Sequence, residues 1–406
     1  MRLAAAYLVF ATAASAQTTQ QAIVPAFYGI PQLTDPQASD PQNADPARRT
    51  AFDWTRIERA GSAVFAVVAD GSFAALADDA SCSTAATVPT DCHASGVTGL
   101  CQAKCQFRRN QNAGQKVFGY VITDSGKRDN DYLDKNGVLV QNCPSAANHK
   151  CVLNGGDLVL PANGGYKGMS SVQDWYNKFC PSQSDPSNCF IDGIFFDVGP
   201  STGPVADSTQ MADYQALFAD FQNLRPFGSC SDSLHPARPC LLLNASQYLN
   251  SWAASVSDYF ILWERALHGK DNQPPDPPNN TQDYVTAFSP SPVPAWWTAN
   301  AAKAEHVVSV ATQNDVASIV QASQDASHGH PSFLYVHDRF QYGSLACFFE
   351  QEIKAMTGQP AVPAKTWCDA TSSCLDLTTT TCPSDFNVTI IVTDPSGKKI
   401  PVVIAL

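Results

Sequence analysis

Short apolar runs alternate with helical patterns along most of the chain. The clearest run extends from Ile191 to Asp197, and every residue before its final aspartate is apolar or glycine, except Asp192. A continuous apolar run of this length is typical of a strand that is buried on both faces. It ends in a carboxylate followed by Val-Gly-Pro, which is a turn signal. We therefore expect a buried strand with an aspartate at its carboxyl end.

Seven further runs have the same character. They span residues 23–28, 63–68, 116–122, 240–244, 259–264, 306–310 and 332–338. Helical patterns separate most of them, at 54–60, 101–113, 172–179, 211–224, 282–288, 296–304, 315–324 and 345–356. Repeated strand-then-helix units are what an α/β fold of the (β/α)8 TIM-barrel type requires. No GxGxxG motif favours a dinucleotide-binding sheet instead.

The two ends of the chain depart from this alternation. Residues 1–16 combine a positive start, a short apolar run and an Ala-Ser-Ala cleavage site, which predicts a secretory signal peptide. We expect the barrel to span residues 17–358. Residues 359–406 contain three cysteines and two β-rich runs around Asp-Pro-Ser-Gly, which predicts a small β extension with a hairpin. No later stretch approaches about 18 apolar residues, so we expect no membrane span.

Cysteine content and charge restrict the function further. The 14 cysteines indicate the disulfide framework of a secreted protein, with disulfide-rich loops, and we expect it outside the cell or in the cell wall. Close sequence pairs are Cys143/Cys151, Cys180/Cys189 and Cys230/Cys240. No matched CxxC pairs occur, so we expect no metal and no cofactor. The net charge of -12 makes nucleic acid and anionic membranes poor partners, whereas a cationic substrate would be attracted. We expect a monomer.

Polar side chains near the strand ends form the candidate site. The set comprises Tyr28, Asp70, Thr123, Asp124, Asp197, Asn244, Glu264, His306, His337 and Asp338. Asp197 ends the fourth strand and Glu264 the sixth, so in a barrel both would reach toward one axis. Two carboxylates flanking a cleft are what glycosidic bond cleavage needs: one protonates the leaving oxygen, and the other attacks the anomeric carbon or activates water.

Several of the polar and aromatic residues also have a structural interpretation. Asp192 and His306 open their strands, which places them at the opposite end of the barrel, and Asp70 precedes Gly71 in a turn. His337 and Asp338 could equally cap the turn that follows them. The aromatic side chains that could stack on sugar rings are Tyr28, Trp263 and the Trp296–Trp297 pair, although burial under a helix suits Trp263 better. Of the glycosylation sequons at Asn244, Asn279 and Asn387, we expect the first to be unused, because a glycan there would block the barrel mouth.

Four segments of the chain resemble the spherulin-4 family. They are Val24–Tyr28, Val117–Thr123, the run from Asp192 to Asp197 and the strand end at Glu264, in matching order and spacing over roughly residues 22–350. The resemblance implies a (β/α)8 barrel. Some members are secreted glycoside hydrolases that cleave galactosaminogalactan, a partly deacetylated and therefore cationic polymer. It also implies that Asp197 and Glu264 are the catalytic carboxylates. Val198 stands where these hydrolases commonly have Glu.

Two functions follow from the sequence. The first is a secreted endo-glycosidase that cleaves a galactosamine- and galactose-containing polysaccharide of a cell wall or biofilm matrix. Glu264 would be the general acid/base, with a pKa raised by its apolar strand, and Asp197 the nucleophile or electrostatic stabiliser. The expected substrate-binding residues are Tyr28, Tyr120, Thr123, Asp124, Asn244 and Asp338. The second function, motivated by Val198, is a catalytically inactive barrel that serves as a carbohydrate-binding or cell-wall structural or stress protein. A serine nucleophile is disfavoured because the GxSxG motif is absent.

Overall fold

A computed structural model gives the fold of the chain, and its described part covers the barrel strands and most of the helices around them. The described residues are 20–27, 50–84, 86–92, 96–122, 172–181, 185, 188–197, 215, 217–219, 221, 229–231, 237–244, 251–267, 283–288, 291–338, 345–346, 348–358 and four short C-terminal strands, 367–368, 374–375, 387–393 and 399–405.

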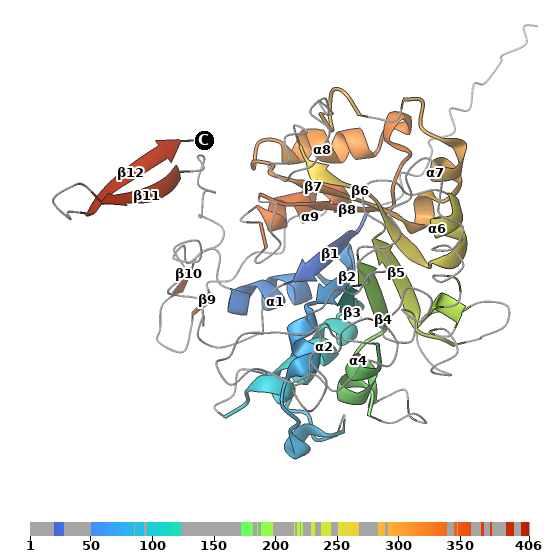
Figure 1. The fold of residues 1–406 in the computed structure, drawn as a ribbon, viewed down its shortest axis with the longest axis vertical. Helices are drawn as coiled ribbons and strands as arrows, with labels where there is room; N and C mark the ends of the chain where they lie inside the picture. The colour runs from blue at the N-terminus through green and yellow to red at the C-terminus, as the bar shows by residue number, and fades with distance from the viewer. Residues whose placement is uncertain are drawn as a thin grey trace, which may run out of the picture.

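Eight strands form one sheet in which each pairs in parallel with the next along the chain (Figure 1). Their bounds are β1 Ala22–Phe27, β2 Val64–Ala69, β3 Lys116–Ile122, β4 Gly193–Asp197, β5 Cys240–Asn244, β6 Tyr259–Ala266, β7 Ala304–Ser309 and β8 Phe333–Val336. At the seam between β8 and β1, Leu334 N donates to Gln21 O at 3.0 Å, and Gln21 N donates to Ser332 O at 3.1 Å. The predicted (β/α)8 barrel is therefore confirmed.

Helices surround this sheet in Figure 1. Their bounds are α1 Thr50–Arg59, α2 Gly99–Asn112, α4 Val172–Phe179, α6 Ser251–Val256, α7 Ala295–Ala299, α8 Val316–Ser323 and α9 Phe349–Thr357, with short 3-10 helices η3 Gly61–Ala63, η4 Gly71–Ala75, η5 Ala80–Cys82, η9 Ala301–Lys303 and η10 Ala326–His328. Within the described residues, no helix is both long and apolar enough to cross a membrane.

The predicted helices differ from the observed ones at two places: one helix was missed, and one predicted helix is only a single turn. Helix α6 was not predicted, although it supplies the crossover between β5 and β6 that parallel pairing requires. The helix expected at 282–288 is a turn over the described residues 283–288. The carboxylate of Asp283 accepts hydrogen bonds from the N–H groups of Val285 and Thr286, at 3.0 and 2.9 Å. These bonds cap a single helical turn, in which Ala287 N donates to Asp283 O at 2.9 Å. Pro290 follows in the sequence and cannot continue a helix.

Aromatic side chains fill the lower part of the barrel and show which face of each strand points inward. The ring of Tyr259 on β6 lies 4.8 Å from Phe65 of β2, 6.4 Å from Phe118 of β3 and 5.7 Å from Phe333 of β8, between centroids. Side chains from four separate strands meet in this way only inside the barrel. Because strand residues two apart share a face, these contacts assign the inward positions along each strand.

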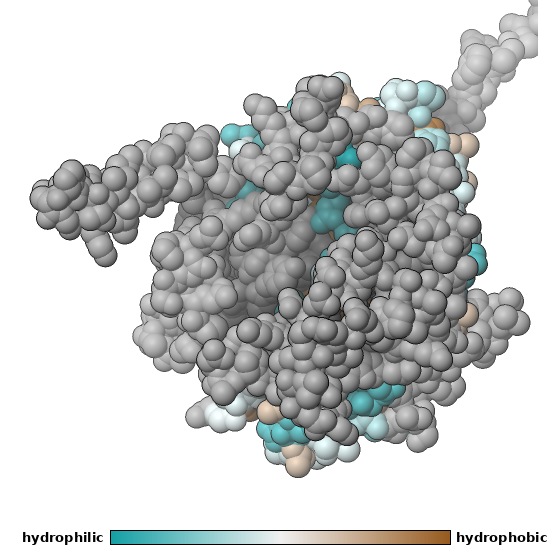
Figure 2. Space-filling view, viewed as in Figure 1, coloured by the Kyte–Doolittle hydropathy of each residue, from teal (hydrophilic) through white to brown (hydrophobic). Residues whose placement is uncertain are grey.

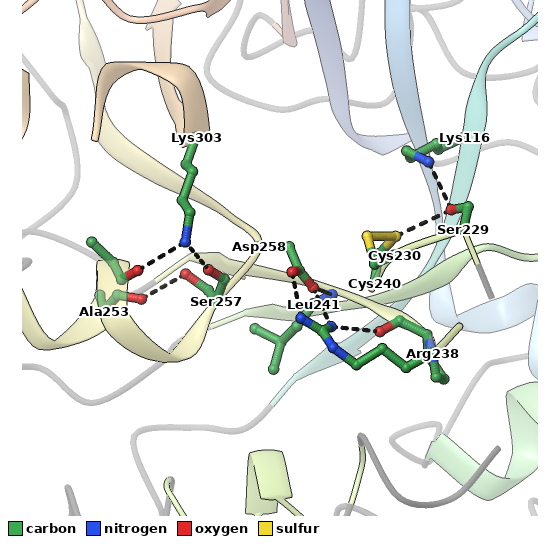
Figure 3. A network of polar contacts seen from close by, with 12 residues as sticks. Lys116, Ser229, Cys230, Arg238, Cys240, Leu241, Ala253, Ser257, Asp258 and Lys303 are labelled. Atoms are coloured by element: carbon green, nitrogen blue, oxygen red, sulfur yellow. Dashed lines mark hydrogen bonds and ion pairs between the residues drawn. A yellow bond between two sulfur atoms is a disulfide. The ribbon is translucent and has the colours of Figure 1, made fainter. Parts of the chain in front are cut away.

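Polar contacts join the amino-terminal ends of β5 and β6 (Figure 3). Arg238 donates to both carboxylate oxygens of Asp258, at 2.7 Å each, and Asp258 also accepts from Leu241 N at 2.8 Å. Lys303 donates to two carbonyl oxygens at the carboxyl end of α6, at 3.1 Å each. In barrels of this type the amino-terminal face serves stability, and this network agrees with that role.

Four disulfides lie in the described part of the chain, which is consistent with a secreted protein. They are Cys82–Cys101, Cys92–Cys105, Cys180–Cys189 and Cys230–Cys240. The last two join cysteines that are close in sequence, as expected, whereas Cys143 and Cys151 fall outside the described residues.

Antiparallel strand pairs occur in the C-terminal part of the chain. Strand β9 Trp367–Cys368 pairs with β10 Cys374–Leu375, and β11 Asn387–Thr393 pairs with β12 Lys399–Ala405. The second pair agrees with the predicted hairpin. The domain boundaries at residues 16 and 358 stay predictions.

Candidate active site

Four predicted site residues lie on four consecutive strands. Tyr120 is on β3, Asp197 ends β4, Asn244 ends β5, and Glu264 lies near the end of β6. The Tyr120 hydroxyl donates to Asp197 Oδ2 at 2.6 Å, and the Asn244 amide donates to Glu264 Oε2 at 2.6 Å. Each candidate catalytic carboxylate thus receives a hydrogen bond from the strand that precedes it.

Tyr120 is positioned by an aromatic contact and by helix α4. Its ring lies 5.7 Å from that of Phe195, and its carbonyl oxygen accepts a hydrogen bond from Trp175 Nε1 at 2.9 Å. The neighbouring Gly119 makes this approach possible, because a Cβ there would lie 2.4 Å from the Trp175 ring. The glycine in the Val-Phe-Gly-Tyr segment therefore helps to orient a site residue.

A β-bulge aims Glu264 into the barrel. Ile261 pairs with Glu305 of β7, but the next pair is Trp263 with His306, so one β6 residue is unmatched. Without the bulge, Trp263 would face inward with Tyr259, and Glu264 would face outward. With it, the Trp263 ring lies 4.8 Å from that of Tyr284 in the layer outside the barrel, and Glu264 reaches Asn244. Bulges beside active sites commonly re-aim side chains in this way.

The two hydrogen bonds bear on the charge of the carboxylates. Phenol and amide donors interact more favourably with an ionised carboxylate than with a carboxylic acid. Asp197 and Glu264 are both partly buried, so these bonds act where water screens them less. The geometry suits two carboxylates held at the carboxyl ends of alternate strands.

A further acidic residue inside the barrel, Glu305, was not identified from the sequence. Strand β7 begins at Ala304, two residues before the expected start, so Glu305 belongs to the strand. Its side chain is fully buried, and burial raises its pKa well above the ordinary value, with the charges of Glu264 and Glu352 adding to the effect. The available signal was its spacing of two from Val307, which places both residues on one face.

His306 is the third residue of β7, so its predicted position at the bottom of the barrel was wrong. Its structural role is supported: the side chain is fully buried, and Nδ1 lies 2.8 Å from the Tyr284 hydroxyl. Burial lowers its pKa well below the ordinary value, and His328 adds to this. Trp263 points outward from the barrel and is buried, which agrees with the prediction that burial suits it better than sugar stacking.

The Trp296–Trp297 pair does not lie where sugar stacking would need it. Trp297 is buried, with its ring 6.3 Å from that of His306, and Trp296 packs 6.3 Å from Phe260 near the start of β6. Both tryptophans therefore belong to the layer between barrel and helices. The proposed stacking role is corrected accordingly.

The remaining predicted residues fall into three groups: residues that follow β8, residues with a structural role, and residues outside the described part of the chain. Asp338 follows β8 and is 6% exposed, and its Oδ1 lies 3.8 Å from Nδ1 of the fully buried His337. Asp192 Oδ2 accepts from Val117 N at 2.9 Å at the amino end of the sheet, which agrees with its structural interpretation. Tyr28, Thr123, Asp124 and Val198 lie outside the described residues.

One cluster in the described part of the chain has the composition of a metal site. Asp79, Cys82 and Cys101 bring three potential ligand atoms within 4.8 Å of one another. The two cysteines form a disulfide with an S–S distance of 2.05 Å, so neither offers a thiolate to a metal.

Comparisons with known proteins show similarity to several solved structures. No protein-family model and no curated protein matches the chain. Aspergillus clavatus Sph3 in complex with GalNAc is 12% identical with a TM-score of 0.43, covering 84% of this chain and 98% of that one. A GH138 enzyme targeting pectin rhamnogalacturonan II is 9% identical with a TM-score of 0.37, covering 89% and 37%. A Cellulomonas fimi endo-beta-1,4-mannanase is 10% identical with a TM-score of 0.34, covering 76% and 70%. Similarities at this level carry no argument about function, and the spherulin-4 resemblance stays a prediction.

Proposed function

We propose that this chain is a secreted glycoside hydrolase that uses Asp197 and Glu264 as its catalytic carboxylates. The observation that carries the proposal is their arrangement. They occupy the carboxyl ends of the alternate strands β4 and β6, and each is held by a donor, Tyr120 or Asn244, from the preceding strand. Active sites of (β/α)8 barrels lie at this end of the strands.

The two carboxylates have different roles in this proposal. Glu264 is the general acid/base that protonates the glycosidic oxygen and then activates water. Asp197, held by the Tyr120 hydroxyl, is the nucleophile or the electrostatic stabiliser of the oxocarbenium-like transition state. Asn244 orients Glu264 through the hydrogen bond to Oε2. Because this asparagine is 6% exposed and already donates to Glu264, its geometry also supports an unused glycosylation sequon.

The proposed substrate is a galactosamine- and galactose-containing polysaccharide of a cell wall or biofilm matrix. The net charge of -12 supports a cationic amino-sugar polymer, because the field of an acidic protein concentrates cations near its surface. The spherulin-4 resemblance of the Asp192–Asp197 run points to the same substrate. In Figure 2 the described residues that can be seen on this face range from teal to white, with some tan ones among them.

The test is reducing-end release from de-N-acetylated galactosaminan by the wild type, Asp197→Asn and Glu264→Gln. We expect each substitution to lower kcat at least about 100-fold, because general acid–base and covalent catalysis each contribute on this scale. Asp185→Asn is the matched control. Its carboxylate accepts a hydrogen bond from Asn188 at 2.6 Å before β4, at the opposite end of the barrel. A Glu264→Gln variant with wild-type turnover would refute the proposal.

A second candidate is a carbohydrate-binding or cell-wall structural or stress protein without catalysis. Val198, in place of the Glu that hydrolases of the resembled family commonly carry, favours it. This function predicts polysaccharide binding without reducing-end release, and turnover gained in Val198→Glu. Release by the wild type that disappears in Asp197→Asn would exclude it.

A further inference from the structure

A third carboxyl group, that of Glu305, lies inside the barrel. Glu305 pairs with Ile261 of β6 and with Phe333 of β8. Phe333 packs against Tyr259 in the barrel interior, with ring centroids 5.7 Å apart, so Glu305 faces the interior as well. Its side chain is 0% exposed, and neither carboxylate oxygen has a hydrogen-bond partner among the described residues.

Glu305 lies diagonally below Glu264 on the inner surface, on the neighbouring strand and nearer its amino-terminal end. Glu264 pairs with Val307, which follows Glu305 by two residues on the same face of β7. Two residues advance about 7 Å along a strand, a separation that long side chains on neighbouring strands can bridge. The surroundings of the two carboxyls differ: Glu264 is partly exposed and accepts a hydrogen bond from Asn244, whereas Glu305 is enclosed.

A negative charge on Glu305 is strongly disfavoured. Burial raises its pKa well above the ordinary value, and the negative charges of Glu264 and then Glu352 raise it further. Among the described residues, the other ionisable side chains on the inner face near Glu305 are Tyr259, Tyr335 and His337. Lys116 lies at the amino-terminal end of the barrel, where its Nζ is 5.6 Å from the centroid of the Phe65 ring and donates to Ser229 Oγ at 2.7 Å. Replacing buried charged side chains by apolar ones of similar size often leaves the stability of a protein unchanged or raises it. Stability therefore does not explain a glutamate here.

We propose that Glu305 is a positioning residue for Glu264: the two carboxyls hold one proton between them, and Glu305 keeps that proton available to Glu264. The inference rests on the proposed function. It meets a requirement of that function, because the Asn244 amide favours an ionised Glu264, whereas a general acid has to carry a proton. In the reaction Glu264 gives the proton to the glycosidic oxygen of the leaving group. The water that then attacks returns one proton to the pair.

The pH dependence of kcat/KM tests this role. Two carboxyls that share a site lose their second proton at a higher pH than an isolated carboxyl does. In Glu305→Gln we therefore expect the alkaline limb of the profile to move to lower pH by about one unit or more. Asp185→Asn is the control, because it also removes one carboxyl group, but at the opposite end of the barrel, where Asp185 accepts a hydrogen bond from Asn188 at 2.6 Å. Its alkaline limb should not move. An unmoved limb in Glu305→Gln would overturn the proposal.

A stability measurement tests the coupling without activity. The pKa of Glu305 is raised on folding, so its contribution to stability is complete below about pH 4.3 and is lost as the pH rises through its folded value. Glu305→Gln should remove this pH-dependent loss of stability. The gain in stability at high pH should be smaller in a Glu264→Gln background, where the neighbouring charge is absent. The effect of Asp185→Asn should be the same in both backgrounds. If Glu305→Gln changes stability equally in the wild-type and Glu264→Gln backgrounds, the coupling is refuted. A wild type that cleaves no polysaccharide would instead refute the proposed hydrolase function.

Discussion

Gly193 has the closest neighbouring atoms of the described glycines, and substitution there tests the packing of β4 against β5. A Cβ at this position would lie 2.1 Å from the carbonyl oxygen of Cys240, the first residue of β5, and 2.7 and 2.9 Å from its carbonyl carbon and Cα. Real Cβ contacts are essentially never below 3.0 Å, so Gly193→Ala requires a movement of at least 0.9 Å, the difference between 3.0 and 2.1 Å. The obstacle is backbone, and no rotamer change relieves it.

The surroundings of Cys240 resist that movement. Its N–H donates to Asp192 O at 2.9 Å, and its sulfur is bonded to Cys230. Overpacking costs about 1–3 kcal/mol, and a weakened backbone hydrogen bond adds about 1 kcal/mol. We therefore expect Gly193→Ala to destabilise the fold by about 2–4 kcal/mol. With an unfolding entropy of about 2.1 cal/mol/K per residue over roughly 340 residues, this lowers Tm by about 3–6 °C.

Thermal unfolding followed by circular dichroism measures this shift. Gly114→Ala is the matched control, because no atom lies within 4 Å of its Cβ position and only its φ of +85° opposes the substitution. That backbone term costs about 1 kcal/mol, or about 1–2 °C. If Gly193→Ala melts no lower than Gly114→Ala, the inferred contact between β4 and β5 is wrong.

Three further predictions concern stability. Asp258→Asn should cost about 3–5 kcal/mol in urea unfolding, because it leaves the buried Arg238 guanidinium without its bidentate partner; a loss below about 1 kcal/mol would contradict this. Val310→Gly should stabilise the protein by about 1 kcal/mol, since a φ of 57° strains a β-branched residue. His330→Gly (φ 52°) should stabilise it less, because His tolerates the left-handed backbone region better. Equal gains in stability would contradict the strain argument. Stability should fall as the pH drops below about 6.5, because the pKa of His306 is lowered on folding and the unfolded chain takes up the proton first. His306→Asn should flatten this dependence of the unfolding free energy on pH. An unchanged slope would show that His306 is not the group responsible.

Much of the fold could be predicted from the apolar runs. Each of the eight predicted strand segments overlaps an observed strand, because a parallel sheet buried on both faces needs a nearly continuous apolar sequence. The same pattern located Asp197 and Glu264 near strand ends. Helix α6 was missed because six residues present too little periodicity. The helix expected at 282–288 is only one turn, capped by Asp283, because Pro290 follows closely in the sequence and cannot continue a helix.

The sequence by itself determined the type of fold and the carboxylates that end its strands, since burial on both faces and turn chemistry are local properties. Only the tertiary structure decided which way those side chains point. The unmatched residue in β6 turns Glu264 inward and Trp263 outward, and it is visible only in the pairing with β7. Likewise, Glu305 has an ordinary place in the sequence and becomes a buried carboxyl near Glu264 because neighbouring strands close around it. Strand register depends on contacts between distant segments, so no local pattern could supply it.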